Sequence, residues 1–393
     1  MPLTATSFVL LCFLCLPSLL SGTLSKSDKK EKKPPIKQKG SLQSATAPTY
    51  QEVKLGANEV LKNHQHIHWG EAKKFPFEVL GYVTPWNNHG YDAAKWLSQK
   101  FTSISPVWFQ IVPKDPSASQ HPGCTIGGTH DNDQGWVGEV RRNNSAVEIL
   151  PRFIFEKWNG VQLRSLLTYE DQQNECAEVL VNFLKRNEFQ GAVLELWASV
   201  MAMSQGLAGS DLISFLRNFG EILHHEDLRI IVPVPPPVDE QNQRSVLFNG
   251  EHFAALVPYV DAVQVMTYDF PDPRPGPVAP INWVRSCIEA LLLALPAPEK
   301  ILLGMNFYGY DYGSEGKAEP VVGHSFLQLL RKHKPQLEWD KSAAEHFIRY
   351  EDHVLYFPSL ASVERRLKLA QELGVGVAVW ELGQGLDYFY NLF

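Results

Sequence analysis

The sequence predicts an α/β protein whose main domain is a (β/α)8 TIM barrel with an insertion between strands 7 and 8. From residue 78 onward, short apolar runs alternate with helix-like segments, the pattern of a parallel sheet with helical crossovers. Eight such units occupy about 310 residues, which suits a barrel. An open doubly wound sheet is the alternative, but the chain lacks the G-x-G-x-x-G turn such a fold normally carries.

The predicted barrel domain covers residues 78–393. Its eight strands are expected at Glu78–Thr84, Ser103–Ile111, Val147–Phe155, Gly191–Trp197, Leu228–Val234, Asp261–Tyr268, Ile301–Tyr308 and Gly374–Glu381. Helices are expected between them, including Tyr91–Lys100, Gln172–Arg186, Asp211–His224, Asn282–Leu295 and Ser359–Leu373. The long stretch Asp311–Pro358 is the predicted insertion.

Two segments are expected before the barrel. Residues 1–22 form a predicted signal peptide, because the apolar run Phe8–Leu20 is shorter than the roughly 20 residues that span a bilayer. An uncleaved anchor is the alternative. Residues 23–77 are predicted to be a basic, largely disordered linker with one short helix. After cleavage no membrane span is expected, and the protein would be secreted.

The charge of the chain is divided unevenly. Residues 25–40 contain seven lysines, one Asp and one Glu, a net charge of +5, whereas the whole chain carries −7. The remainder therefore carries −12, and nucleic-acid binding by the folded part is not expected.

Several smaller motifs have limited meaning. Cys124, Cys176 and Cys287 allow at most one internal disulfide, and the sequence leaves the pairing open. Asn143 begins a glycosylation sequon. The histidines in the segment 64–68 lack an evident fourth ligand, so no metal site is predicted, and no cofactor either. The segment 131–133 lacks calcium-loop spacing and is interpreted as a solvated rim loop.

Aromatic residues stand at the expected carboxyl ends of seven of the eight strands. Barrel enzymes work at this face, and flat rings stack on the C–H faces of sugars, so these rings predict a saccharide cleft. Each ring taken singly is better explained as a side chain that fills the end of the barrel core than as a binding surface.

Four segments resemble strands one, six, seven and eight of glycoside hydrolase family eighteen, the chitinases. They are Val79–Trp86, Gln264–Asp269, Lys300–Gly309 and Gly376–Trp380. The resemblance implies a saccharide-binding site at Tyr82, Trp86, Glu195, Trp197, Met266, Tyr268, Asp269, Asn306, Tyr308 and Trp380. Within the family, residues 130–136 and 380–390 resemble a stabilin-interacting, chitinase-like type. That resemblance implies a stabilin-type scavenger receptor as partner, recognition of oligosaccharides and lipopolysaccharide, and lysosomal or late endosomal traffic.

The fourth strand bears on catalysis. Active members resemble Phe-Asp-Gly-x-Asp-x-Asp-x-Glu there, with the final Glu as general acid in a substrate-assisted reaction. Here the segment 189–197 places Val193 and Glu195 at the two interior Asp positions and Trp197 at the acid. Because strand side chains alternate, these three residues are expected to share the inward face. An indole cannot protonate a glycosidic oxygen, so no catalytic residue is predicted.

Three functions remain open at this stage. The favoured one is an inactive chitinase-like lectin that binds N-acetylglucosamine-containing oligosaccharides in glycan or pathogen sensing. The second is an active hydrolase whose acid has moved to Glu195, Asp269 or Glu381. The third is a partner-binding protein with a vestigial cleft. Glu195 itself is interpreted equally well as a ligand contact or as a buried acid satisfied by Tyr268 or a backbone donor.

Overall fold

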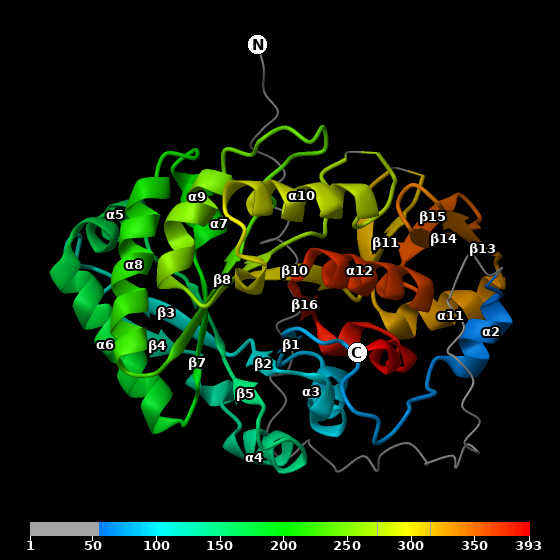
Figure 1. The fold of residues 1–393 in the computed structure, drawn as a ribbon, viewed down its shortest axis with the longest axis horizontal. Coiled ribbons are helices and arrows are strands. Elements are labelled where there is room, and N and C mark those ends of the chain that lie inside the picture. Colours follow the sequence, from blue (N-terminus) through cyan, green and yellow to red (C-terminus); the bar gives the residue numbers. More distant parts are fainter. Residues whose placement is uncertain (1–54, 273, 315) are drawn as a thin grey trace.

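The main domain is built on a curled, largely parallel sheet. The computed structural model describes residues 55–272, 274–314 and 316–393 (Figure 1), so the predicted signal peptide and residues 23–54 of the predicted linker lie outside the described residues. Eleven strands follow the order β4-β3-β6-β7-β8-β9-β10-β16-β1-β2-β5, and only β3 and β4 run antiparallel. Their bounds are β1 Val79–Val83, β2 Ser103–Pro106, β3 Phe109–Pro113, β4 Cys124–Gly127, β5 Glu148–Ile149, β6 Arg152–Phe155, β7 Gly191–Glu195, β8 Arg229–Val234, β9 Ala262–Val265, β10 Ile301–Asn306 and β16 Gly376–Trp380.

The strand arrangement differs from a plain eight-stranded barrel. The second and third predicted runs are each divided, into β2 and β3 and into β5 and β6. Proline interrupts both runs, at Pro106 and Pro151, because it has no N–H to donate to a neighbouring strand. Each divided run therefore contributes a strand to both ends of the sheet: β2 pairs with β5 at one end, and β3 pairs with β6 at the other. The sheet therefore curls back toward itself as a half-barrel.

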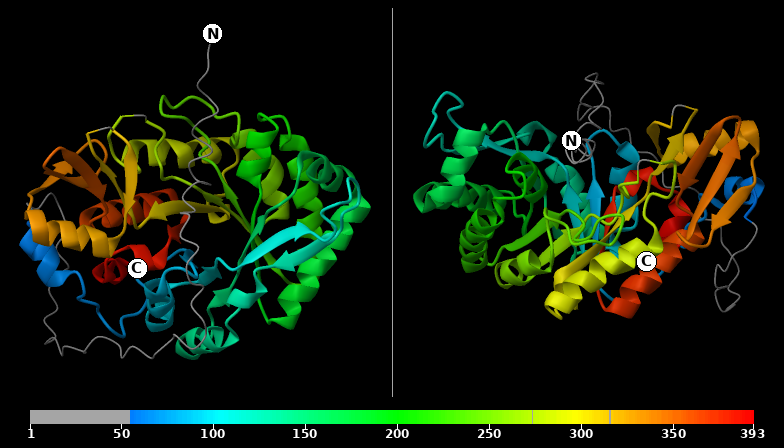
Figure 2. Two further views of the ribbon diagram at one scale, coloured as in Figure 1. Left: turned by 180° about the vertical axis from the view of Figure 1, so that it is seen from behind. Right: turned by 90° about the horizontal axis from the view of Figure 1, so that it is seen from above.

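Helices cover the outer face of this sheet (Figures 1 and 2). Their bounds are α3 Asn88–Trp96, α4 Gln134–Asn143, α5 Gly160–Thr168, α6 Glu170–Arg186, α7 Trp197–Met203, α8 Gly209–His225, α9 Gly250–Leu256, α10 Ile281–Ala294 and α12 Leu360–Leu373. Short 3-10 helices are η2 Ser98–Lys100, η3 Thr129–Asp131, η4 Val257–Tyr259, η5 Pro298–Lys300, η6 Leu382–Gln384 and η7 Asp387–Leu392. The five helices expected from the sequence correspond to α3, α6, α8, α10 and α12.

The predicted rim loop at residues 131–133 is wrong in part. Asp131 ends η3, and Asp133 is the N-cap of α4, where its Oδ1 accepts a hydrogen bond from the backbone N–H of Trp136 at 3.0 Å. A short acidic side chain in this position satisfies a helix donor that has no partner within the helix. Helix capping therefore accounts for Asp133 without a metal ion.

A second sheet lies between β10 and β16 along the chain. Its strands β11 Gly309–Tyr312, β12 Ala318–Val321, β13 Leu337–Asp340, β14 Glu345–Tyr350 and β15 His353–Phe357 are antiparallel, in the order β12-β11-β15-β14-β13. Helix α11, Gly323–His333, packs on it, with the rings of Phe326 and Phe357 stacked at 4.2 Å. Seen from above, this sheet lies at one end of the molecule, away from the helices that follow β6, β7 and β8 in the chain (Figure 2).

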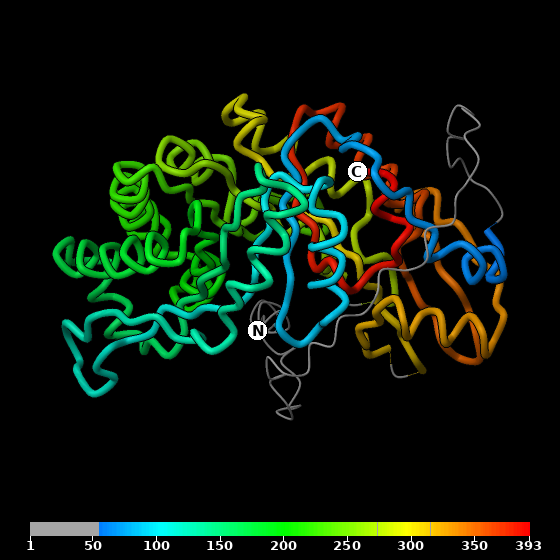
Figure 3. Tube along the Cα trace, turned by 90° about the horizontal axis from the view of Figure 1, so that it is seen from below, coloured from blue at the N-terminus to red at the C-terminus, as the bar shows by residue number. Residues whose placement is uncertain are grey.

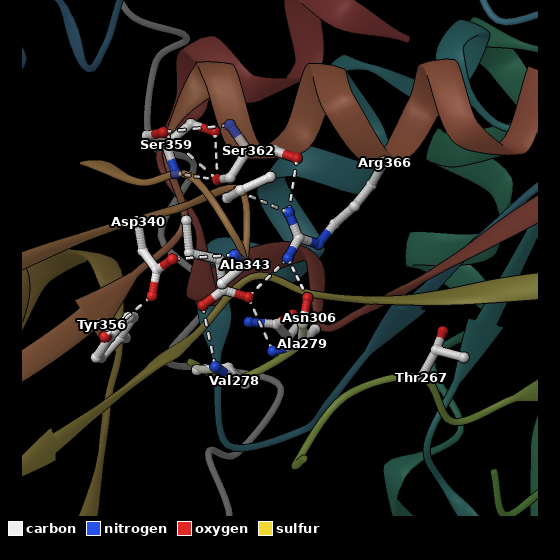
Figure 4. Close-up of polar contacts among 12 residues, drawn as sticks. Thr267, Val278, Ala279, Asn306, Asp340, Ala343, Tyr356, Ser359, Ser362 and Arg366 are labelled. Atoms are coloured by element: carbon white, nitrogen blue, oxygen red, sulfur yellow. Dashed lines mark hydrogen bonds and ion pairs between the residues drawn. The ribbon is translucent and has the colours of Figure 1, made fainter. Parts of the chain in front are cut away.

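A buried ion pair connects the second sheet to the main domain. Arg366 on α12 donates to Glu345 on β14 at 2.6 Å and to the carbonyl oxygen of Ala344 at 3.2 Å (Figure 4). The Glu345 carboxylate also accepts from the backbone N–H groups of Val278 and Ala279. A cavity beside this pair measures about 10 Å³, room for one water molecule but not for a sugar.

Part of the predicted linker is folded. Residues 55–77 contain helix α2, Ala57–Asn63, which packs against α11, and the buried side chain of Phe75. Figure 3 follows this blue segment from α2 to β1. Hydrogen bonds link it to the C-terminal residues, including one from the N–H of His68 to Asn391 Oδ1 at 2.7 Å and one from Lys74 Nζ to the carbonyl oxygen of Asn391 at 3.0 Å. The description of residues 55–77 as disordered is therefore wrong.

The cysteine pairing that the sequence left open is resolved. A disulfide joins Cys124 on β4 to Cys176 on α6, and Cys287 is a buried free thiol. Among the described helices, none has the length and apolar composition needed to cross a membrane.

Two apolar clusters lie on opposite faces of the curled sheet. The larger one packs the sheet against its helices. The smaller one draws alternate residues from successive strands and fills the inside of the curl: Leu80, Tyr82, Val107, Leu150, Val193, Ile231, Ala262, Leu302 and Ala378. Trp380 packs against this inner cluster. The inner face at the carboxyl ends of the strands is therefore where a ligand could meet the sheet.

Candidate functional site

Tyr82, Tyr268 and Trp380 are brought together at the inner face. The rings of Tyr82 on β1 and Trp380 on β16 have centroids 5.2 Å apart. The Tyr82 hydroxyl donates to Gln264 Oε1 at 3.3 Å, and Gln264 Nε2 donates to the Tyr268 hydroxyl at 3.4 Å. A polar chain thus crosses from β1 to β9 above the inner apolar cluster. Burial and the nearby carboxylate of Glu195 raise the pKa of Tyr82, so its hydroxyl stays protonated at neutral pH.

Glu195 is the last residue of β7, and its side chain is paired with Arg152. Arg152 Nε on β6 donates to Glu195 Oε2 on β7 at 2.6 Å. Both side chains remain slightly exposed, Arg152 by 16% and Glu195 by 25%. Neither Tyr268 nor a backbone donor, the two partners expected for a buried acid, bonds Glu195 among the described residues. The carboxylate is therefore an acceptor already engaged by a guanidinium, with its Oε1 left available.

Trp197 does not lie in the site, contrary to the prediction. Strand β7 ends at Glu195, and Trp197 begins α7, so the alternation of side chains along the strand stops before residue 197. The indole is fully buried in the outer cluster, and its Nε1 donates to the carbonyl oxygen of Leu247 at 2.8 Å. Its ring packs edge-on against Phe248. Trp197 is a core residue and cannot contact a saccharide.

A second polar group surrounds Asp269, just beyond β9. Asp269 Oδ1 accepts hydrogen bonds from the hydroxyls of Tyr308 and, at 2.9 Å, Tyr310. The same carboxylate, together with burial, raises the pKa of Tyr308 well above its usual value. Asn306 Nδ2 donates to the carbonyl oxygen of Tyr308 at 2.7 Å, which fixes the start of the second sheet. Met266, also past β9, is partly buried against the outer cluster.

The aromatic residues at the strand ends divide into two groups. Trp86 is 63% exposed in the turn after β1, and Trp380 is partly exposed. Trp108 and Phe307 are fully buried in the outer cluster, as Trp197 is. A ring at a strand end therefore marks the core as often as it marks a binding face, as the alternative interpretation of the sequence allowed.

Two predictions concern residues away from the inner face. Asn143 is exposed at the end of α4, and its Nδ2 donates to the carbonyl oxygen of Lys95 at 2.9 Å; glycosylation there stays a prediction. Within residues 55–272, 274–314 and 316–393, no group of three or more His, Cys, Asp or Glu side chains could hold a metal ion.

The sequence interpretation missed Arg152 and Gln264. Arg152 is the one charged residue in the otherwise apolar strand β6, and Gln264 is the one amide in the otherwise apolar strand β9. Each interrupts an apolar pattern on a strand that is buried on both faces, and that interruption is the signal that could have found them.

The comparisons with known proteins agree with this architecture. Residues 78–385 match Glycosyl hydrolases family 18. A cortical fragment-lytic enzyme of Bacillus subtilis is 30% identical over 182 residues, which cover 43% of this chain and 42% of that enzyme. The chain thus spans less than half the length of that relative. An uncharacterized glycosylase of the same organism, YvbX, is 26% identical over 77% of this chain and 89% of its own length.

Solved structures show the same fold. A chitinase from Chromobacterium violaceum has a TM-score of 0.68 at 20% identity, over 80% of this chain and 97% of that one. The spore cortex-lytic enzyme SleL of Bacillus megaterium has a TM-score of 0.63 at 23% identity, over 80% of this chain and 72% of that one. The family match covers more than three quarters of the sequence, and it agrees with the chitinase-like α/β fold that these structures share with this chain. The chain belongs to glycosyl hydrolases family 18.

Proposed function

We propose that this protein is a catalytically inactive, chitinase-like lectin that binds oligosaccharides containing N-acetylglucosamine. The observation that carries the proposal is the geometry at the acid position. Residue 197 is a tryptophan whose side chain lies on the helical side of the sheet, so the position offers neither a proton donor nor access to a ligand. General acid catalysis contributes on the order of 10²–10⁴ in rate, and its donor is absent from this position.

The remaining groups suit binding. Trp86 and Trp380 offer ring faces, while Glu195 Oε1 and the two Nη groups of Arg152 make no hydrogen bond to any described residue. One acceptor and several donors near flat rings are what a sugar with hydroxyl and acetamido groups needs. The proposed site is therefore Tyr82, Trp86, Arg152, Glu195, Met266, Tyr268, Asp269, Asn306, Tyr308 and Trp380, without Trp197.

The relocated acid is the second candidate, and two contacts count against it. Glu195 accepts from a guanidinium, and Asp269 accepts from two tyrosine hydroxyls. Both carboxylates are already engaged as hydrogen-bond acceptors, and the third candidate, Glu381, has no exposed surface, whereas a general acid must present a proton to the glycosidic oxygen.

The finer identity is part of the same proposal. Residues 130–136 and 380–390 resemble chitinase domain-containing protein one, the stabilin-interacting chitinase-like protein. On that resemblance we propose lipopolysaccharide as a further ligand, a stabilin-type receptor as partner, and a secreted protein that reaches lysosomes or late endosomes in glycan and pathogen sensing.

Calorimetric titration with chitotetraose, together with product analysis from pH 4 to 8, tests the function. We expect binding without turnover, and binding about five-fold weaker in Trp380→Ala, the value of one aromatic contact. Leu293→Ala, at an 87% exposed position on α10, is the control and should bind as the wild type does. Turnover abolished by Glu195→Gln or Asp269→Asn would establish a relocated acid. If the protein shows neither binding nor turnover, a vestigial site is favoured.

A further inference from the structure

A buried carboxyl group connects two parts of the proposed site. Glu381 directly follows Trp380 at the end of β16 and has no exposed surface. Its Oε2 accepts a hydrogen bond from Asn87 Nδ2 at 2.8 Å. Asn87 closes the turn after β1, where its N–H donates to the carbonyl oxygen of Thr84 at 3.1 Å. This turn, residues 84–87, carries the exposed Trp86, and we call it the Trp86 turn.

Two glycines let the backbone pack closely around this carboxyl group. A Cβ placed on Gly90 would lie 2.2 Å from Glu381 Oε1, and a Cβ on Gly383 would lie 2.5 Å from Asn87 Nδ2. Glycine at both positions lets α3 and η6 approach closely enough to enclose the Glu381–Asn87 contact. The carboxyl group is thus held against the Trp86 turn by backbone on two sides.

We propose that Glu381 is a positioning residue of the saccharide site, and that its ionisation sets how Trp86 and Trp380 are presented to a ligand. The inference rests on the proposed binding function. Glu381 Oε1 is buried without a hydrogen-bond partner among the described residues, so Oε2 makes the contact with Asn87. A hydrogen bond to an ionised oxygen is about twice as strong as one to a neutral oxygen. Protonation therefore weakens the contact that holds the Trp86 turn.

The surroundings place this change near neutral pH. Burial raises the pKa of Glu381 to about 7, although the backbone of Gly383 and Thr84, the Asn87 amide and His89 act in the opposite direction. The other titratable groups near it are His89, Tyr91 and Asp92 on α3, and Asp387 and Tyr390 on η7. His89 is bonded to Asp387 at 2.6 Å, which raises its pKa as well. His89 is therefore the group whose titration must be separated from that of Glu381.

The test measures the affinity of the full chain for chitotetraose between pH 6 and pH 8. We expect the wild type to bind about five-fold more weakly at pH 6, the scale of one lost aromatic contact. Glu381→Gln, which cannot ionise, should bind at every pH as weakly as the wild type at pH 6. His89→Gln should keep the pH dependence. Asn87→Ala is a second variant in case Glu381→Gln does not fold, and it should bind weakly at both ends of the range.

A ligand-free measurement separates this inference from the binding function. In protein labelled with ¹⁵N-tryptophan, the indole N–H resonances of Trp86 and Trp380, assigned with Trp86→Phe and Trp380→Phe, should titrate together near pH 7. They should not titrate in Glu381→Gln. If they titrate but chitotetraose binds at no pH, the binding function is wrong and the positioning role is supported. If the wild type binds with an affinity independent of pH and the resonances do not move, the positioning role is overturned.

Discussion

The family resemblance expects a glutamate at position 197, yet the structure predicts that Trp197→Glu unfolds the protein. The side chain at position 197 points away from the inner face, into the cluster between sheet and helices. A glutamate there would be a buried carboxyl group with no charged partner, far from any ligand at the inner face.

The magnitude follows from the contacts that are lost. Removing a fully buried tryptophan costs about 3–5 kcal/mol, and leaving the carbonyl oxygen of Leu247 without its 2.8 Å donor costs about 1–3 kcal/mol more. The sum is comparable to the whole stability of a typical domain, about 5–15 kcal/mol. Adding Val193→Asp and Glu195→Asp would not rescue the variant. Val193 lies in the inner cluster and Glu195 at the end of β7, so neither new carboxylate could stabilise a glutamate buried at position 197.

Urea denaturation and chitotetraose cleavage are the two assays. Trp197→Glu should lose at least about 4 kcal/mol of unfolding free energy, or fail to fold, and should show no cleavage. Trp86→Glu is the matched control: the same substitution at a 63% exposed tryptophan should change stability by no more than about 0.5 kcal/mol. A Trp197→Glu protein that folds with wild-type stability and cleaves chitotetraose would refute the placement of residue 197.

Three further predictions concern stability. The double variant Cys124→Ser, Cys176→Ser should lose up to about 4 kcal/mol of unfolding free energy, measured by urea denaturation, because the disulfide closes a loop whose ends are 52 residues apart. A double variant as stable as the wild type would contradict this prediction. Burial raises the pKa of Glu381 in the folded protein to about 7, against 4.5 in the unfolded chain. The free energy of unfolding is therefore highest below pH 4.5 and falls by about 3 kcal/mol as the pH rises to 7. Glu381→Gln should lack this fall when the two proteins are denatured in parallel. Burial lowers the pKa of His346 to about 4, so the neutral imidazole stabilises the fold fully above pH 6.5, and about 3 kcal/mol of unfolding free energy is lost as the pH falls toward 4. If His346→Gln loses stability with pH as steeply as the wild type, another group is responsible.

The sequence predicted much of the site but not its contacts. Tyr82, Tyr268 and Trp380 are brought together because alternation along β1 and β16 and the position after β9 fix which way each side chain points. The partner of Glu195 could not be predicted, because Arg152 is 43 residues away and only strand pairing between β6 and β7 brings the two together.

What the sequence determined by itself is local and periodic: the alternation of apolar runs and helices, and the family. Tertiary structure decided where strands end, and there the periodic argument fails. Alternation predicts the direction of a side chain only while the backbone stays extended, and β7 ends two residues before Trp197. Prolines divided two strands, close contacts with the C-terminal residues ordered the segment 55–77, and the fold chose Cys176 as the partner of Cys124. The prolines are a local signal that the prediction passed over, whereas the order of residues 55–77 and the disulfide depend on contacts between residues distant in the chain, which no local pattern encodes.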